Sequence, residues 1–218
     1  LAQTPAANGP HDPERGRQIE GGLKTELSRG RVLLTGSLFR IDKNNVLRPD
    51  PVFGPSGDNF AAVLPIGKVR NQGFEFDAAG RVTRDFSVIV NYSFLNSEIL
   101  TDRFTPTAVG QPLPNAARHA FGLFARYDIA RTGTSLSVGN EARGRRYEPY
   151  AGIQAAGYGI WDFGVFQKLG RYLEFRGQLD NAFDRIYATS SLFAARAGNI
   201  PGAPRTFTAA LHFRTAAR

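Results

Sequence analysis

The sequence predicts an all-β protein, an antiparallel transmembrane β-barrel of which this chain supplies about nine strands. Hydrophobic and polar residues alternate along most of the 218 residues, which is the period of a strand with two different faces. The alternating segments have about 9–12 residues, the length that crosses a bilayer at a tilt of about 45°. Connections of about 2–4 and about 10–24 residues follow one another in turn, as in outer-membrane barrels.

The first four strands are predicted at residues 17–27, 32–43, 68–80 and 86–99. Short turns join the first to the second and the third to the fourth. The stretch between the second and third strands is rich in Pro, Gly, Asn and Asp, which favour turns and loops. A second long loop, LTDRFTPTAVGQPLPNA, follows the fourth strand.

The remaining five strands are predicted at residues 118–129, 134–146, 158–169, 172–180 and 205–213. The turn ARTG joins the strands at 118–129 and 134–146. A turn containing Gly-Arg joins the strands at 158–169 and 172–180. Residues 147–157 and 183–204 are predicted as long loops. The regular succession of short and long connections therefore continues to the end of the chain.

The strand at 172–180 shows the two faces most clearly. Leu173, Phe175 and Leu179 lie on one face, whereas Glu174 and Arg176 lie on the other. A soluble antiparallel sandwich produces the same alternation. Strand length and loop asymmetry favour the membrane barrel, and charged side chains suit a water-filled lumen better than a packed core.

Composition excludes several kinds of protein. The chain has no Cys, so it has no disulfide and no thiolate metal site. Its formal charge is +8 and its isoelectric point about 10.2, but the cations are scattered over turns and polar faces, so we expect no nucleic-acid partner. The chain starts at Leu1 with no signal-peptide pattern and has no apolar run long enough for a membrane helix.

No catalytic or metal-binding pattern stands out. The sequence lacks a G-x-S-x-G nucleophile motif, and its three His residues show no metal-ligand spacing. We assign His119 and His212 structural roles and predict neither an enzyme nor a bound cofactor. A barrel-embedded hydrolase stays open as an alternative.

Six local motifs occur in one order. They are GRQIEGGLKTEL, KVRNQGFEFDAAG (with Gly73 and Glu75), LPNAARHAFGLFARYDI, EARGRRY, LDNAFDRIY (with Asn181, Phe183, Asp184 and Tyr187) and GAPRTFTAALHF (with Pro204 and Arg205). In this order the chain resembles the C-terminal barrel portion of TonB-dependent outer-membrane receptors, in the ferric-siderophore branch.

The resemblance implies a 22-stranded barrel with an N-terminal plug domain and a TonB box, both outside this stretch. It implies import of a ferric siderophore across the Gram-negative outer membrane, energised by the TonB–ExbB–ExbD complex, with outer-membrane lipid and lipopolysaccharide around the wall. We expect residues 1–16 to be the remnant of an extracellular loop, 17–213 to be barrel and 214–218 a C-terminal extension. One departure is that Phe213 is followed by RTAAR, whereas the family ends on an aromatic residue.

Candidate ligand contacts combine cations and aromatic rings in the predicted loops and outer rim. Such residues suit bulky anionic complexes through charge attraction and stacking. They are Arg48, Phe53, Phe60, Arg103, Phe104, Arg145, Arg146, Tyr147 and Tyr150. The alternatives are contact with lipopolysaccharide and anchoring of the rim.

The LDNAFDRIY motif is predicted to be structural. Asn181 and Asp184 can hydrogen-bond the local backbone and fix a bend, while Phe183 and Tyr187 are expected at the outer membrane edge. Other cargoes (haem, cobalamin or a glycan) and a passive porin remain alternative functions at this stage.

Overall fold

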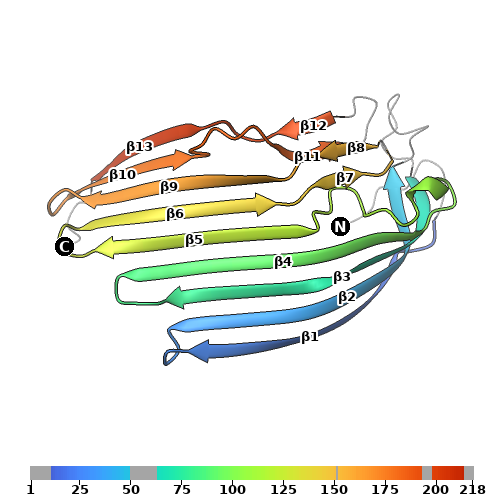
Figure 1. Cartoon of the computed structure of the whole chain (residues 1–218), viewed down its shortest axis with the longest axis horizontal. Coiled ribbons are helices and arrows are strands. Elements are labelled where there is room, and N and C mark those ends of the chain that lie inside the picture. The colour runs from blue at the N-terminus through green and yellow to red at the C-terminus, as the bar shows by residue number, and fades with distance from the viewer. Residues whose placement is uncertain (1–10, 50–62, 151, 193–197, 214–218) are drawn as a thin grey trace.

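The computed structural model describes residues 11–49, 63–150, 152–192 and 198–213. They form one antiparallel sheet of nine strands in the order β1-β2-β3-β4-β5-β6-β9-β10-β13 (Figure 1). Each long strand pairs with the next long strand along the chain, so the sheet is a meander. The predicted fold class and the nine strands are confirmed.

The strands of the sheet are β1 (Arg15–Leu27), β2 (Val32–Pro49), β3 (Val63–Arg81), β4 (Phe86–Thr101), β5 (His119–Ile129), β6 (Thr134–Arg143), β9 (Tyr158–Lys168), β10 (Leu173–Asp180) and β13 (Thr206–Phe213). Two small hairpins, β7 (Arg146–Glu148) with β8 (Ile153–Ala155) and β11 (Ala188–Leu192) with β12 (Gly198–Pro201), lie in the connections. A 3₁₀ turn, η1, covers Pro106–Ala108.

The predicted length of about 9–12 residues is too short by at least four residues for three strands. β2 has 18 residues, β3 has 19 and β4 has 16. Their extra residues lie at the end with the long connections, where Ile66, Val69, Ile99 and Ala108 form a small buried core. Apolar side chains that bury one another keep the strands paired beyond the height that a membrane requires.

The connections confirm the predicted asymmetry. Residues 28–31, 82–85, 130–133 and 169–172 form tight turns at one end of the sheet, and the long connections lie at the other (Figure 1). No helix in the part of the chain that the structure describes is long and apolar enough to span a membrane.

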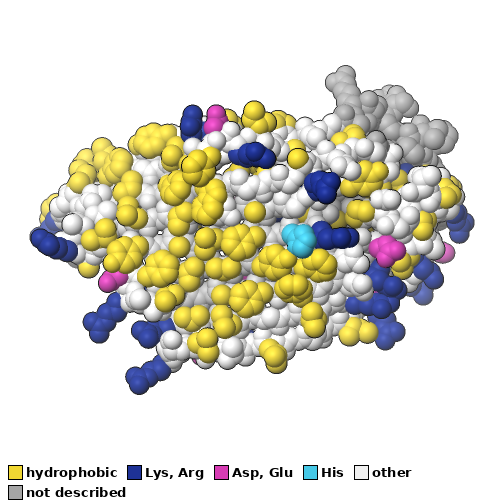
Figure 2. All heavy atoms as spheres, viewed as in Figure 1, with side chains coloured by type: hydrophobic (Ala, Val, Ile, Leu, Met, Phe, Trp, Pro, Cys, Tyr) yellow, Lys and Arg dark blue, Asp and Glu magenta, His cyan; other side chains and the backbone are white. Residues whose placement is uncertain are grey.

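The two faces of the sheet differ as predicted. Residues paired across strands share a face, so the pairing joins Gly21, Leu38, Phe74 and Phe94 in one apolar row. We call this side the apolar face, and hydrophobic side chains gather over its middle in Figure 2. The opposite parity is the polar face, which carries Glu75, Asp77, Arg126, Asp128, Glu174 and Arg176.

Several large hydrophobic side chains depart from this division, among them Phe39, Ile89, Phe124 and Phe166. Ile89 and Phe124 are paired with each other on the polar face and are 49% and 46% exposed. Tyr158 also lies on the polar face, where its hydroxyl donates a hydrogen bond to Glu141. Parity along the strand, and not hydrophobicity, therefore decides which face a side chain occupies.

The predicted loops at residues 147–157 and 183–204 also carry short strands: β7, which starts at Arg146, pairs with β8, and β11 pairs with β12. The two hairpins touch each other: Arg146 of β7 donates to the carbonyl oxygens of Ala188 and Thr189 in β11. Strands of three to five residues are too short to show an alternation, and the contact that stabilises them joins two loops distant in sequence.

Candidate ligand site at the loop end of the sheet

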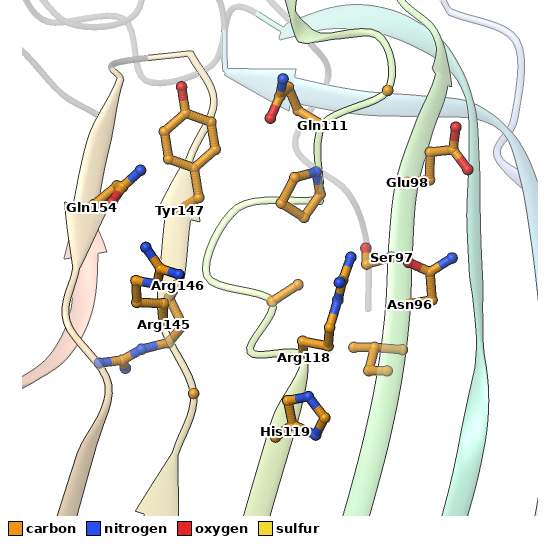
Figure 3. A pocket seen from close by; sticks show the side chains of 15 residues that line it. Asn96, Ser97, Glu98, Gln111, Arg118, His119, Arg145, Arg146, Tyr147 and Gln154 are labelled. Carbon is orange, nitrogen blue, oxygen red and sulfur yellow. The ribbon is translucent and has the colours of Figure 1, made fainter.

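A hollow of about 730 Å³ opens at the end of the sheet that carries the long connections (Figure 3). Asn96, Ser97 and Glu98 of β4 lie on one side of it, and Tyr147 and Gln154 of the β7–β8 hairpin lie on the other. The rest of the lining consists of Leu95, Gly110, Gln111, Pro112, Ala116, Arg118, His119, Gly144, Arg145 and Arg146. We call this the loop-end hollow.

The hollow exists because β5 starts late. Its first residue, His119, is paired with Phe94, so the upper part of β4 is paired with β3 on one side and has no strand on the side of β5. The connection from β4 to β5 takes that place: the Ile99 N–H donates to the Gln111 carbonyl at 2.9 Å, and the Leu95 N–H donates to the Arg118 carbonyl at 2.9 Å. Arg118 is exposed, and Figure 3 shows its side chain between β4 and the hairpin.

The hairpin supplies the opposite wall. Arg145 is exposed, whereas Arg146 is only 5% exposed and has its guanidinium 5.3 Å from the ring centre of Tyr158. Because Arg146 also donates to the carbonyl oxygens of Ala188 and Thr189, it holds the two hairpins together. Arg118 and Arg145 are thus the exposed cations at this hollow.

A second hollow, of about 580 Å³, adjoins the first on the polar face and shares Leu95, Ala116 and Arg146 with it. We call it the inner hollow. Glu141 lies in its wall, where it is paired with Arg143 at 3.1 Å and accepts a hydrogen bond from the Tyr158 hydroxyl at 3.0 Å. Its other lining residues are Phe39, Glu75, Ser93, Asn115, Ala117, Ala120, Tyr187 and Thr189.

A buried cluster fixes the loops above these hollows. Arg48, at the end of β2, donates to the Thr105 hydroxyl at 2.7 Å, and its Nε lies 3.7 Å from an Asp102 carboxylate oxygen. Its guanidinium stands 4.2 Å from the ring centre of Tyr150. Asp102 also accepts hydrogen bonds from the N–H groups of Phe104 and Thr105. We call Arg48, Asp102, Thr105 and Tyr150 the loop cluster.

Burial changes the protonation of the groups around this cluster. Desolvation, followed by the effect of the Asp102 charge, raises the pKa of Tyr150 to about 12. Desolvation also raises the pKa of Glu148, which is only 1% exposed and accepts a hydrogen bond from the Tyr150 N–H. Both the Tyr150 hydroxyl and the Glu148 carboxyl group are therefore partly shielded from water.

The structure brings together three of the predicted ligand residues, Arg145, Arg146 and Tyr147, at the loop-end hollow. Arg48 and Tyr150 also meet, but inside the loop cluster and away from an open surface. Arg103 and Phe104 are exposed on the loop that follows β4. Phe53 and Phe60 lie outside the described residues. A ligand role for these residues remains a prediction.

Sequence reasoning missed Arg118, Gln111 and Gln154. Gln111 and Arg118 lie in a Pro-rich connection that shows no alternation of hydrophobic and polar residues. The available signal was the position of Arg118, which directly precedes a strand at the end where the long loops meet.

The residues of LDNAFDRIY contact the later GAPR motif. The Asn181 side-chain amide donates to the carbonyl oxygens of Arg185 and Ala203, and an Asp184 oxygen accepts from the Arg205 N–H. Phe183 is 72% exposed. Tyr187 does not lie at the outer membrane edge as predicted: its ring packs on Tyr158 at 4.5 Å and lines the inner hollow. The bend at Asn181 and Asp184, both with positive φ, turns the chain in that direction.

The family model that matches this chain is the TonB-dependent receptor-like β-barrel, over residues 1–182. That match covers most of the chain and agrees with the nine-stranded meander described above. The chain belongs to the TonB-dependent receptor family. The resemblance inferred from the six motifs is confirmed.

Two named relatives of this TonB-dependent receptor chain are equally similar in sequence. The metal-pseudopaline receptor CntO of Pseudomonas aeruginosa is 28% identical over 210 residues, which is 92% of this chain and 28% of CntO. The catecholate siderophore receptor Fiu of Escherichia coli is 28% identical over 226 residues, which is 98% of this chain and 28% of Fiu. The chain thus spans less than a third of these relatives.

Solved structures agree on the barrel. The closed form of the ferric-catecholate import receptor Fiu from E. coli superposes with a TM-score of 0.76 and 26% identity over 98% of this chain and 30% of that one. The siderophore receptor PiuA from Acinetobacter baumannii superposes with a TM-score of 0.79 and 20% identity over 97% of this chain and 30% of that one. The nine strands therefore match one part of the barrel wall of these larger receptors.

Proposed function

We propose that this chain is the C-terminal part of the barrel of an outer-membrane receptor that imports a ferric siderophore. The wall, lumen surface and loops would come from residues 15–213, since β1 begins at Arg15 and not at the predicted residue 17. A plug domain elsewhere in the protein would fill the lumen and couple transport to the TonB–ExbB–ExbD complex.

The observation that supports this function is the pair of adjoining hollows at the loop end of the sheet. The loop-end hollow presents Arg118 and Arg145 with Tyr147, and the inner hollow continues along the polar face with Tyr158 and Tyr187. Cations and aromatic rings suit a bulky anionic complex wrapped in partly apolar ligands. The names of CntO and Fiu, both receptors for metal-binding small molecules, support the same cargo class.

Other functions would need other features. Haem, cobalamin or a glycan would suit the same barrel, and the cargo test below separates them from ferric siderophores. A passive porin would lack a plug domain. A barrel-embedded hydrolase would need a nucleophile beside a base, and we propose no enzymatic activity.

Cargo binding by the intact receptor tests the proposal. We expect an anionic ferric catecholate complex to quench the protein fluorescence of purified receptor, and the double variant R118E/R145E to weaken that binding by about tenfold or more, since each reversal replaces attraction by repulsion. The control variant R84E/R131E reverses two arginines at the tight turns and is expected to bind normally.

Binding of haem, cobalamin or a glycan in place of every ferric complex tried would contradict the proposed cargo. Equal affinity of the R118E/R145E variant and the control variant for a ferric complex would contradict the proposed site. Uptake of radioactive iron by cells that carry each variant provides the second readout.

A further inference from the structure

Three side chains and one glycine form a stacked column beside the two hollows. The Tyr187 ring lies against Gly202, where a Cβ would be 2.1 Å from a ring atom, and its centre is 4.5 Å from that of the Tyr158 ring. The Arg146 guanidinium stands 5.3 Å from the centre of the Tyr158 ring. We call Gly202, Tyr187, Tyr158 and Arg146 the aromatic column.

The column joins two connections that are distant in sequence. Tyr187 and Gly202 belong to the connection between β10 and β13, where the Gly202 N–H donates to the Tyr187 carbonyl oxygen at 2.8 Å. Arg146 begins the β7–β8 hairpin and donates to the carbonyl oxygens of Ala188 and Thr189. These two residues directly follow Tyr187, so the hydrogen bonds and the stacked rings attach the hairpin to the same short segment.

The middle of the column belongs to the sheet. Tyr158 is the first residue of β9, is paired with Arg143 of β6 and donates its hydroxyl to Glu141 at 3.0 Å. Its ring therefore moves with the barrel wall and not with the connections. Ring pairs at this separation and a cation within about 6 Å of a ring centre are both attractive contacts. Tyr158 thus offers one fixed surface to both connections.

Arg146 lies between two residues of the candidate cargo site. Arg145 and Tyr147 both line the loop-end hollow. The Tyr147 carbonyl oxygen accepts from the Asn115 N–H at 3.1 Å, which attaches the hairpin to the connection after β4. A two-stranded hairpin has little stability of its own, so its orientation depends on such outside contacts. Loss of the column would leave Arg145 and Tyr147 with a wider range of positions.

We propose that Tyr187 is a positioning residue for the loop-end hollow, which it does not itself line. The Tyr187 ring, packed between Gly202 and Tyr158, fixes the backbone whose carbonyl oxygens bind Arg146. Arg146 in turn holds Arg145 and Tyr147 at the hollow. The effect on cargo affinity rests on the proposed function, whereas the effect on the hairpin can be measured without cargo.

Replacement of the ring in the intact receptor tests this role. We expect Y187L to weaken binding of a ferric catecholate complex by about three- to tenfold, which corresponds to the loss of one aromatic pair. Y187F keeps the ring and is expected to bind like the wild type. G202A should act like Y187L, because its methyl group displaces the ring. The controls Y172L, at a tight turn, and G159A, whose Cβ would meet Ala142 at 3.8 Å, should bind normally.

A comparison of backgrounds shows whether the effect passes through the hollow. In an R145Q/Y147A receptor, we expect Y187L to weaken binding no further, since its effect depends on those two side chains. A further loss as large as that in the wild type would overturn the proposal. An equal loss in Y187F and Y187L would also overturn it, because the ring would then be irrelevant.

Hydrogen exchange of residues 146–155 without cargo provides the second readout. We expect Y187L and G202A to speed exchange there by about three- to tenfold and the three other variants to leave it unchanged. Unchanged exchange in Y187L would overturn the proposal. A wild-type receptor that binds no ferric complex would contradict the proposed function, and the exchange result would then decide by itself whether Tyr187 positions the hairpin.

Discussion

Gly73 of β3 lies where no side chain fits beside the backbone of β4. A Cβ atom at this position would lie 1.9 Å from the Phe94 carbonyl oxygen and 3.3 Å from the Leu95 Cα. Both neighbours are backbone atoms of a paired strand, so they cannot turn away as a side chain would. The glycine that helped to reveal the family is therefore required by sterics at the point where two strands meet.

We expect G73A to destabilise the folded barrel by about 1–3 kcal/mol or more, because the added methyl group forces the two backbones apart. The control is G139A in β6, a strand paired on both sides, since a Cβ at Gly139 would meet Asp162 at 3.6 Å and the Leu123 carbonyl oxygen at 4.0 Å, which are ordinary contact distances. The measurement is the fraction of intact receptor that keeps the mobility of the folded form on an unheated denaturing gel. Equal folded fractions for the two variants would show that the strands separate at no cost.

Glu148 is a buried carboxyl group whose pKa is raised above its ordinary value by desolvation. A group with a raised folded-state pKa contributes stability below its unfolded pKa of about 4.5, and this contribution is lost as the pH rises through the folded-state pKa. Near neutral pH, the ionised carboxylate therefore disfavours the closed β7–β8 hairpin.

We expect E148Q to stabilise this hairpin near pH 7.5, because the ionised carboxylate is desolvated in the hairpin whereas the amide carries no charge. The amide oxygen can still accept the hydrogen bond from the Tyr150 N–H. The measurement is hydrogen exchange of residues 146–155, with E20Q on exposed β1 as the control. The advantage of E148Q should disappear below about pH 4, and an advantage that persists there would contradict a role for ionisation.

At the scale of elements, the connection between β10 and β13 is held by two motifs that are distant in sequence. Asn181 is 3% exposed, and its side chain bonds the backbone at Arg185 and Ala203. The Tyr187 ring lies against Gly202, where a Cβ would be 2.1 Å from a ring atom. The two signatures thus form one structural unit.

We expect N181D to loosen this unit, because a carboxylate keeps the acceptor but loses the amide that donates to two carbonyl oxygens. A buried acceptor left without its donor costs about 1–3 kcal/mol. The measurement is the rate of proteolysis within residues 181–205 of the intact receptor, with the neighbouring exchange D180N as the control. Equal rates of cleavage in N181D and the control would show that the amide contributes nothing there.

The sequence predicted the nine long strands because hydrophobic and polar solvents on opposite faces impose a period of two on every one of them. It did not predict the upper parts of β2 and β3, which depend on contacts in the buried core between residues distant in sequence, such as Val46 and Ile66. The stretch that joins these strands is rich in turn-forming residues. Asn45, with a positive φ, lies inside β2, where the strand pairing shifts register.

The candidate site was predictable only in part, for a related reason. Arg145 and Tyr147 stood out as a cation beside an aromatic residue, and both line the loop-end hollow. The same pattern suggested Arg146, whose guanidinium instead joins two hairpins. Cations and aromatic rings hold loops together, and the same residue types bind ligands. Residue type alone therefore does not distinguish a loop contact from a ligand contact.

At the scale of the whole molecule, the interpretation depends on parity deciding the solvent that each side chain meets. Neighbours Leu123 and Phe124 provide the sharpest comparison, because both are hydrophobic yet lie on opposite faces. Phe124 pairs with Ile89 on the polar face. If hydrophobicity alone decided placement, the two positions would meet the same solvent.

Spin labels at Leu123, Phe124, Leu173 and Glu174 of the intact receptor in lipid vesicles distinguish these possibilities. We expect dissolved oxygen, which concentrates in hydrocarbon, to accelerate the spin relaxation of labels at Leu123 and Leu173. Labels at Phe124 and Glu174 should be shielded from oxygen and show the contacts of a lumen wall, because their side chains point away from the lipid. Equal oxygen accessibility within either pair would mean that the faces do not meet two solvents, and the barrel assignment of this sheet would fail.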